Sequence, residues 1–152
     1  MTPQDLAKWV REENEKVTVL ISALRERVAL APPARGSAWL KEFRERFEHL
    51  RAHLVRHMAL EEKAPGGYLA CVLELRPTLA PQVDRLKHNH EEMRRLMDVL
   101  HRQIELVRPD DRLFLRDTMS RICDFLGYLE QHHEQETLIM TYAFTQELGV
   151  QA

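Results

Sequence analysis

Four long segments of the chain carry apolar residues at alternating steps of three and four, and this spacing is the feature that most constrains the fold. Such spacing places the apolar side chains on one stripe along an α-helix. Clusters of helix-breaking residues separate the four segments: APPARGS at 31–37, APGG at 64–67, Pro77 within RPT, and RPDD at 108–111. The pattern therefore predicts four amphipathic helices joined by short links.

The predicted helices cover residues 2–30, 37–63, 78–107 and 111–147. The first has a favourable start, with Thr2 as the N-cap, Pro3 in the first helical position and the acidic Asp5 in the first turn. The segment GYLACVLEL at 67–75 has room for one or two further turns. Because short links favour antiparallel neighbours, we predict an all-α, antiparallel up-down four-helix bundle that forms a single domain over residues 1–152.

Composition narrows the classes of partner. Hydrophobic residues make up 44% and charged residues 30% of the chain, and the net charge of -2 offers no electrostatic footprint for nucleic acid. No apolar run approaches the roughly 20 residues that span a bilayer. With two cysteines and no apolar signal segment, we expect a cytoplasmic protein without nucleic-acid or membrane partners. The charged outer faces leave a homodimer open.

Histidine and glutamate occupy positions on three of the apolar stripes without any break in the spacing. The stripes read Phe43, Phe47, Leu50, Leu54, His57, Glu61 in the second helix, Val83, Leu86, His90, Met93, Met97 in the third, and Phe125, Leu129, His132, Glu136, Ile139 in the fourth. The chain has two further His-x-x-x-Glu pairs, His88/Glu92 and His101/Glu105, but these lie off the stripes and are expected to point outward. Position therefore distinguishes the two pairs that enter the core.

An internal repeat supports this assignment. His132 and Glu136 follow His57 and Glu61 by 75 residues, so the first helix should correspond to the third. Apolar residues follow His90 at offsets 3, 6, 7, 10 and 14, and they follow Asn14 at the same offsets. Three histidines, two carboxylates and one asparagine are therefore predicted to meet in one layer of the core.

These donor types limit the chemistry of that layer. A buried carboxylate without a partner costs several kcal/mol, and no Lys or Arg lies on a stripe at this level. One interpretation is a metal-free hydrogen-bonded network. The other is a metal centre, because imidazole with carboxylate and no thiolate suits iron, manganese or zinc, and carboxylate-bridged di-iron centres form between facing helices of bundles. We favour the metal centre, in which two bridging carboxylates fit two ions.

Three stretches carry a family resemblance: HMALEE at 57–62, NHEEM at 89–93 and HHEQETLIMTYAF at 132–144. They resemble the helix motifs of the hemerythrin-like, or HHE cation-binding, family. The resemblance implies that the metal ligands are His57, Glu61, His90, His132 and Glu136, with both glutamates bridging two non-haem iron ions. It also implies a protein that binds or senses O2 or a related small oxidant, with a diatomic molecule or peroxide as the partner at the metal, rather than an enzyme.

Two departures from the family pattern shape the expected function. Oxygen-carrying members have a second histidine in the third helix, whereas Leu86 and Arg94 stand four residues to either side of His90. A dedicated oxygen carrier is therefore disfavoured. Asn14 stands where the family has a histidine, and an amide oxygen is a poorer ligand for iron than imidazole nitrogen. The metal position beside His57 is expected to lack one ligand.

Three residues are further candidates for that position. Glu13 could bind the metal or lie on the solvated helix surface, Asn14 could bind it or hydrogen-bond to a ligand, and His53 could bind it or extend outward. Tyr128 stands one turn before His132, as His53 does before His57, and could join a neighbouring polar layer. We expect the remaining polar neighbours to be exposed: His49, Glu62, His133 and Glu134.

Three functions follow from these alternatives. The first is a di-iron protein that binds or senses a small oxidant. The second is a bundle that binds a single Fe or Zn ion in a structural or signalling role. The third is a metal-free bundle that acts as a protein-interaction module through its charged faces.

Overall fold

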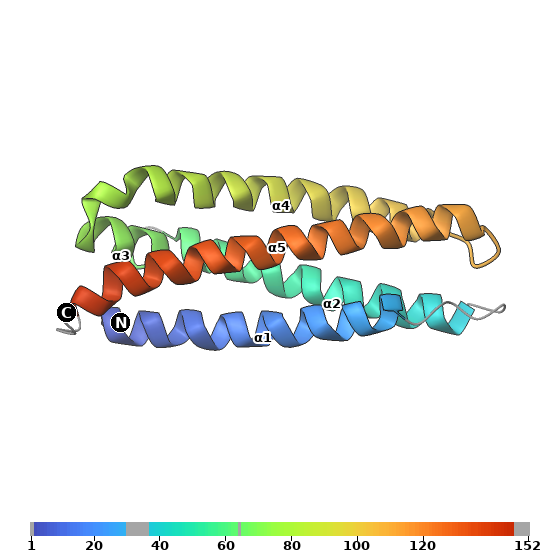
Figure 1. Ribbon diagram of the computed structural model, residues 1–152, viewed down its shortest axis with the longest axis horizontal. Helices are drawn as coiled ribbons and strands as arrows, with labels where there is room; N and C mark the ends of the chain where they lie inside the picture. The colour runs from blue at the N-terminus through green and yellow to red at the C-terminus, as the bar shows by residue number, and fades with distance from the viewer. Residues whose placement is uncertain (1, 30–36, 64, 148–152) are drawn as a thin grey trace.

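A computed structural model describes residues 2–29, 37–63 and 65–147, with side chains up to residue 144. Its elements are the helices α1 (Pro3–Ala29), α2 (Ser37–Glu62), α3 (Tyr68–Leu75), α4 (Ala80–Leu106) and α5 (Arg112–Glu147), with a 3-10 turn, η1 (Pro77–Leu79), before α4. The four long helices run alternately up and down along one axis (Figure 1). The predicted all-α antiparallel bundle is confirmed.

The helix boundaries follow local capping chemistry. The Thr2 hydroxyl accepts a hydrogen bond from the Asp5 backbone N–H at 3.1 Å, and the Asp5 carboxylate accepts one from the Thr2 N–H at 3.0 Å. Asp111 caps α5 by accepting a hydrogen bond from the Phe114 N–H at 3.1 Å. The third predicted helix begins two residues late, because Pro77 starts a 3-10 turn. The predicted end of the first helix at Leu30 lies outside the described residues.

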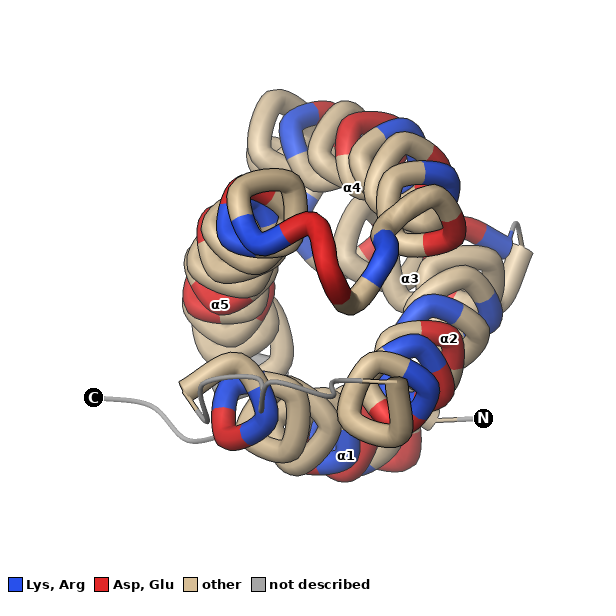
Figure 2. The backbone as a smooth tube through the Cα atoms, turned by 90° about the vertical axis from the view of Figure 1, so that its right-hand side faces the viewer, with Lys and Arg blue, Asp and Glu red and all other residues tan. Residues whose placement is uncertain are grey.

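The long helices form a closed ring in the order α1, α2, α4, α5, with each helix packed against its two neighbours (Figure 2). Their apolar stripes meet along the axis of the ring. Positively and negatively charged residues are interspersed along the long helices (Figure 2). None of the described helices is long and apolar enough to cross a membrane. The ring arrangement brings one face of every long helix to a common core.

The short helix α3 covers the end of the bundle where α1 begins and α5 ends (Figure 1). Gly66 has a φ of +99°, a conformation that side chains rarely adopt, and a Cβ at Gly67 would collide with the backbone carbonyls that end α2. This turn reverses the chain after α2. As a result Tyr68, which is fully buried, donates a hydrogen bond from its hydroxyl to the backbone carbonyl of Glu136 at 2.9 Å.

Candidate metal centre

A polar layer divides the core of the bundle into two apolar clusters. The larger cluster includes Val17, Met58, Met93 and Leu129, and the smaller includes Val10, Tyr68, Leu86, Ile139 and Met140. On α1, α4 and α5 the predicted polar positions lie between residues of the two clusters, and on α2 Glu61 follows Met58, the last residue of the larger cluster. The layer therefore lies where the stripes carry histidine and glutamate instead of apolar residues.

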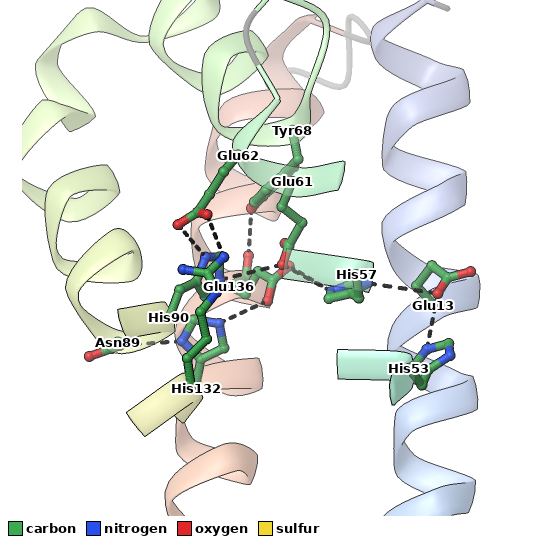
Figure 3. Close-up of polar contacts among 11 residues, drawn as sticks. Glu13, His53, His57, Glu61, Glu62, Tyr68, Asn89, His90, His132 and Glu136 are labelled. Carbon is green, nitrogen blue, oxygen red and sulfur yellow. Dashed lines mark hydrogen bonds and ion pairs between the residues drawn. The ribbon is translucent and has the colours of Figure 1, made fainter. Parts of the chain in front are cut away.

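The five predicted ligands meet in this layer, and all five are buried. His57 and Glu61 come from α2, His90 from α4, and His132 and Glu136 from α5 (Figure 3). Each is at most 3% exposed. The helical spacing of four residues within α2 and within α5 places each His and Glu pair on the same side of its helix, facing the opposite helix.

The two glutamates join the histidines across the layer. Oε1 of Glu61 lies 3.0 Å from Nε2 of His57 and 3.5 Å from Nε2 of His90. Glu136 has one oxygen on each side: Oε1 lies 3.7 Å from Nε2 of His57, and Oε2 lies 3.4 Å from Nε2 of His132. Both carboxylates therefore span the gap between His57 and the pair formed by His90 and His132.

These close approaches are not hydrogen bonds. Among the described residues, no hydrogen-bond partner serves either ring nitrogen of His57, Nε2 of His90, or any of the four carboxylate oxygens of Glu61 and Glu136. Two donor atoms bound to one ion at about 2.1 Å lie roughly 3.0–3.4 Å apart in octahedral or tetrahedral geometry. The observed separations of 3.0–3.7 Å are close to that range. The donor set therefore fits metal ions better than it fits internal hydrogen bonds.

The potential ligands form three groups, each with its donor atoms within 4.8 Å of one another. We call them group 1 (Glu61, His90, His132), group 2 (His57, His133, Glu136) and group 3 (Glu13, His53, His57). Groups 1 and 2 share the polar layer and are linked by the two glutamates. Group 3 lies toward α1, on the other side of the His57 ring (Figure 3).

Outer polar residues hold the rings of His90 and His132. Nδ1 of His90 lies 3.0 Å from Glu62, whose second oxygen accepts a hydrogen bond from Arg94 at 2.6 Å. Nδ1 of His132 lies 3.3 Å from the side-chain amide of Asn89, which accepts a hydrogen bond from the Tyr128 hydroxyl at 3.1 Å. Because the Glu62 carboxylate accepts, Nδ1 of His90 donates and its Nε2 is left for the centre, whereas the Asn89 amide donates to Nδ1 of His132 and fixes the orientation of that ring.

His57 is held differently. The Trp9 ring stacks on the His57 ring with centroids 5.4 Å apart. Nδ1 of His57 lies 3.7 Å from Glu13, whose same oxygen is 3.1 Å from Nε2 of His53. Of the three extra candidates, Glu13 and His53 therefore meet at the outer edge of the centre. The Asn14 side-chain oxygen is buried without a hydrogen-bond partner among the described residues.

Burial and neighbouring charges shift several pKa values in the metal-free layer. Burial lowers the pKa of His57, but contacts with Glu136 and Glu61 outweigh it and raise the value to about 10. Burial and the neighbouring Glu136 raise the pKa of Glu61 well above its ordinary value. Although burial opposes it, contacts with Glu61, His132 and His57 keep the pKa of Glu136 low. Burial lowers the pKa of His90 to about 4.

At neutral pH these shifts define the protonation of the metal-free centre. His57 is a cation paired with an ionised Glu136, His90 is neutral, and the raised pKa of Glu61 favours its protonated form. No Lys or Arg forms an ion pair with either buried glutamate within the described part of the chain. Metal ions would replace these protons.

Two of the residues expected at the surface lie beside the centre instead. His133 is half-buried and belongs to group 2, and burial lowers its pKa to about 4. Glu62 is half-buried and holds His90. The expectation for both was wrong, because only one stripe per helix was assigned to the core and contacts between helices bury its flanks.

The surface expectation is confirmed for four other residues, whereas Glu92 and His101 are half-buried. His49, His88 and Glu134 are exposed, and so is Glu105. His101 is half-buried and pairs with Glu48 on the outside of the bundle, away from the polar layer.

A groove of about 680 Å³ lies between α1 and α5, beside the polar layer. Its lining includes Asn14 and Thr18 from α1 and His133, Glu134 and Thr137 from α5. His133 therefore contacts both the groove and group 2. A small molecule entering from this side would meet group 2 before group 1.

Taken together, four facing helices with buried bridging carboxylates and histidines define a cation-binding helical bundle. The family model described as the hemerythrin HHE cation-binding domain matches residues 5–106, and the chain belongs to that family. No curated protein and no solved structure matches the chain. The matched segment contains His57, Glu61 and His90. His132 and Glu136 follow it, and the fold brings them into contact with Asn89 and His57 of the matched part.

Proposed function

We propose that this bundle holds two non-haem iron ions and binds a small oxidant, O2 or peroxide, as a sensor. In this proposal group 1 holds one ion, group 2 holds the other, and the carboxylates of Glu61 and Glu136 bridge them. Bound iron would supply the redox chemistry and the coordination position that a diatomic molecule or peroxide needs. The protein residues fix the two ions, exclude bulk water and control access.

The observation that carries this proposal is the set of unpartnered donors in the polar layer. Both oxygens of two fully buried glutamates lack hydrogen-bond partners among the described residues, and three of these four oxygens lie 3.0–3.7 Å from histidine nitrogens. A metal-free network would leave several of these groups unsatisfied, at about 1–3 kcal/mol each. This makes a metal-free interaction module the weakest of the three alternatives.

The arrangement of Glu136 supports a pair of ions rather than one. Its two oxygens face different histidines, His57 on one side and His132 on the other. A single Fe or Zn ion at group 1 would use only the side of Glu136 that faces His132. Two ions satisfy both sides of the carboxylate.

Small-oxidant binding is supported by the setting of the centre. The groove between α1 and α5 is lined by His133 of group 2, while apolar clusters close the layer above and below. Group 1 is enclosed, since Glu61, His90 and His132 are all buried. A small ligand is therefore expected to bind on the group 2 side.

Metal analysis under anaerobic conditions tests the proposal. The untagged protein, reconstituted with Fe²⁺ and desalted, should contain two irons per chain by mass spectrometry. Exposure to air or to stoichiometric peroxide should produce near-ultraviolet charge-transfer absorption. His132→Ala should remove group 1 and reduce the iron content, whereas the exposed control His49→Ala should keep two irons.

The result separates the three alternatives. One ion per chain, Fe or Zn, would support the mononuclear alternative and contradict the paired centre. A metal-free protein with the same melting temperature before and after Fe²⁺ addition would contradict metal binding altogether. Two irons that show no spectral response to O2 or peroxide would refute the sensing role but keep the metal centre.

A further inference from the structure

We infer that His133 of α5 supplies the second histidine nitrogen at the group 2 metal position. It would take the place of the α1 histidine that Asn14 replaces in this chain. The inference rests on the proposed pair of ions and assigns one ligand within it. His133 lies off the apolar stripe of α5, so the spacing that predicts the five central ligands does not include it.

The first step is the imbalance between the two groups. Group 1 has two histidine nitrogens, from His90 and His132, together with the carboxylate of Glu61. Without His133, the other side of the layer would have a single histidine, His57, with the two shared carboxylates. An ion bound there would need at least one more donor, and imidazole nitrogen suits iron and zinc better than an amide oxygen.

The second step is the position of His133. Consecutive residues of a helix point about 100° apart, so the adjacent His132 and His133 serve different sides of α5. His132 turns toward Asn89 on α4, and His133 turns toward the groove that Asn14 of α1 also lines. The His133 ring lies 6.4 Å from the His57 ring, at 69° to it. Its donor atom lies within 4.8 Å of those of His57 and Glu136.

The third step compares the rivals on α1. Glu13 approaches Nδ1 of His57, on the side of the ring opposite to the glutamates, and its other oxygen pairs with Lys16 at 3.0 Å. It is therefore placed to hold the His57 ring rather than to reach the ion bound at Nε2 (Figure 3). Asn14 lines the same groove as His133 but offers only an amide oxygen. His133 is the one imidazole of group 2 besides His57.

The test uses Fe²⁺ titration of the full-length apo protein under anaerobic conditions, with iron per chain measured after desalting. In wild type, two ions should bind. In His133→Asn, the first Fe²⁺ should bind with nearly unchanged affinity, and the second should bind at least 10-fold more weakly. Circular dichroism controls for folding, and His49→Ala controls for the loss of an exposed histidine.

Two rescue experiments separate a ligand role from a structural one. Because His133 lines the groove, free imidazole should restore the second ion in His133→Gly, and it should do nothing for the wild-type protein. A histidine introduced at the facing position, Asn14→His, should also restore the second ion in the His133→Asn background. If His133 only filled space, a histidine on the neighbouring helix α1 would not replace it.

The outcomes distinguish this assignment from the function on which it rests. Two tightly bound ions in both wild type and His133→Asn would overturn the assignment and leave the paired centre intact. Loss of the second ion in Glu13→Gln with retention in His133→Asn would transfer the role to Glu13. A single ion in wild type would overturn the paired centre, and the assignment with it.

Discussion

Replacing Glu61 with Gln should stabilise the metal-free protein at neutral pH, although it removes a proposed bridging ligand. Burial and the neighbouring Glu136 raise the pKa of Glu61 well above its ordinary value of 4.5, so the folded protein keeps this carboxyl protonated to a higher pH than the unfolded chain does. The unfolded chain ionises it. Glutamine has nearly the same shape as the protonated side chain and needs no proton.

The size of the effect follows from the pH. Protonating a carboxyl with an ordinary pKa of 4.5 at pH 7 costs about 3 kcal/mol, because each pH unit is worth about 1.4 kcal/mol. Above pH 4.5 the folded state holds a proton that the unfolded state lacks, so the stability of the wild-type apo protein falls as pH rises. The advantage of Glu61→Gln should therefore grow as the pH rises above 4.5, to at most about 3 kcal/mol at pH 7.

The assay is urea unfolding of the chelator-treated proteins, followed by circular dichroism at pH 5.5, 6.2 and 7. His57, with its pKa raised to about 10 partly by Glu61, adds a decline above pH 6.5 that amounts to at most about 0.7 kcal/mol at pH 7, so the difference between the two proteins reports mainly on Glu61. Glu136→Gln is the matched control. It removes the ionised partner of His57 and should destabilise the apo protein by about 3–5 kcal/mol.

The reasoning about protonation would be refuted if Glu61→Gln were less stable than wild type at pH 7. It would also be refuted if the difference between the two proteins did not change with pH. With iron present the order should reverse, because the variant loses a carboxylate that wild type uses for both ions.

Three further predictions follow from the same layer. Metal binding should release protons, because His57 is protonated in the apo protein, and affinity should rise with pH; calorimetry in two buffers of different ionisation enthalpy measures this, and equal heats would contradict it. Glu62→Gln should weaken Fe²⁺ binding about 10–100-fold, because it releases the His90 ring. Glu92→Gln, which affects only the ion pair with Arg95, should leave the affinity unchanged. Equal Fe²⁺ affinities of the two variants would show that the His90 ring does not need the Glu62 contact. Phe43→Ala should lower the free energy of unfolding by about 3–5 kcal/mol and leave the iron content unchanged, because Phe43 lies in the larger apolar cluster. Val19→Ala, at an exposed position, is the control. Loss of iron in Phe43→Ala would show that this cluster and the metal centre are not independent.

Periodicity predicted the fold and the central residues of the site because both depend on which face of each helix is buried. An unbroken stripe through Leu54, His57 and Glu61 requires the polar residues to enter the core, whatever the details of packing. The turn at Gly66 and the end of α2 were similarly visible as APGG.

The flanks of the stripes were less predictable, because their burial depends on neighbouring helices. His133 stands in a heptad series with Met119, Leu126 and Met140, all of them buried, and this series was the available signal. Glu62 has no such signal. Its place beside the centre depends on His90 and Arg94 of α4, and a contact between two helices cannot be read from the spacing within one.

The polar layer also has a consequence for how the bundle unfolds. The apolar cluster containing Phe43 and the one containing Tyr68 are separate, so in the apo protein they are linked by the helix backbones and by the layer of protonated and charged groups between them. We expect the end capped by α3 to open on its own in amide hydrogen exchange of the apo protein. Ions bound to α2, α4 and α5 would couple the two halves into one cooperative unit. Metal binding should then slow amide exchange even in the first turns of α1.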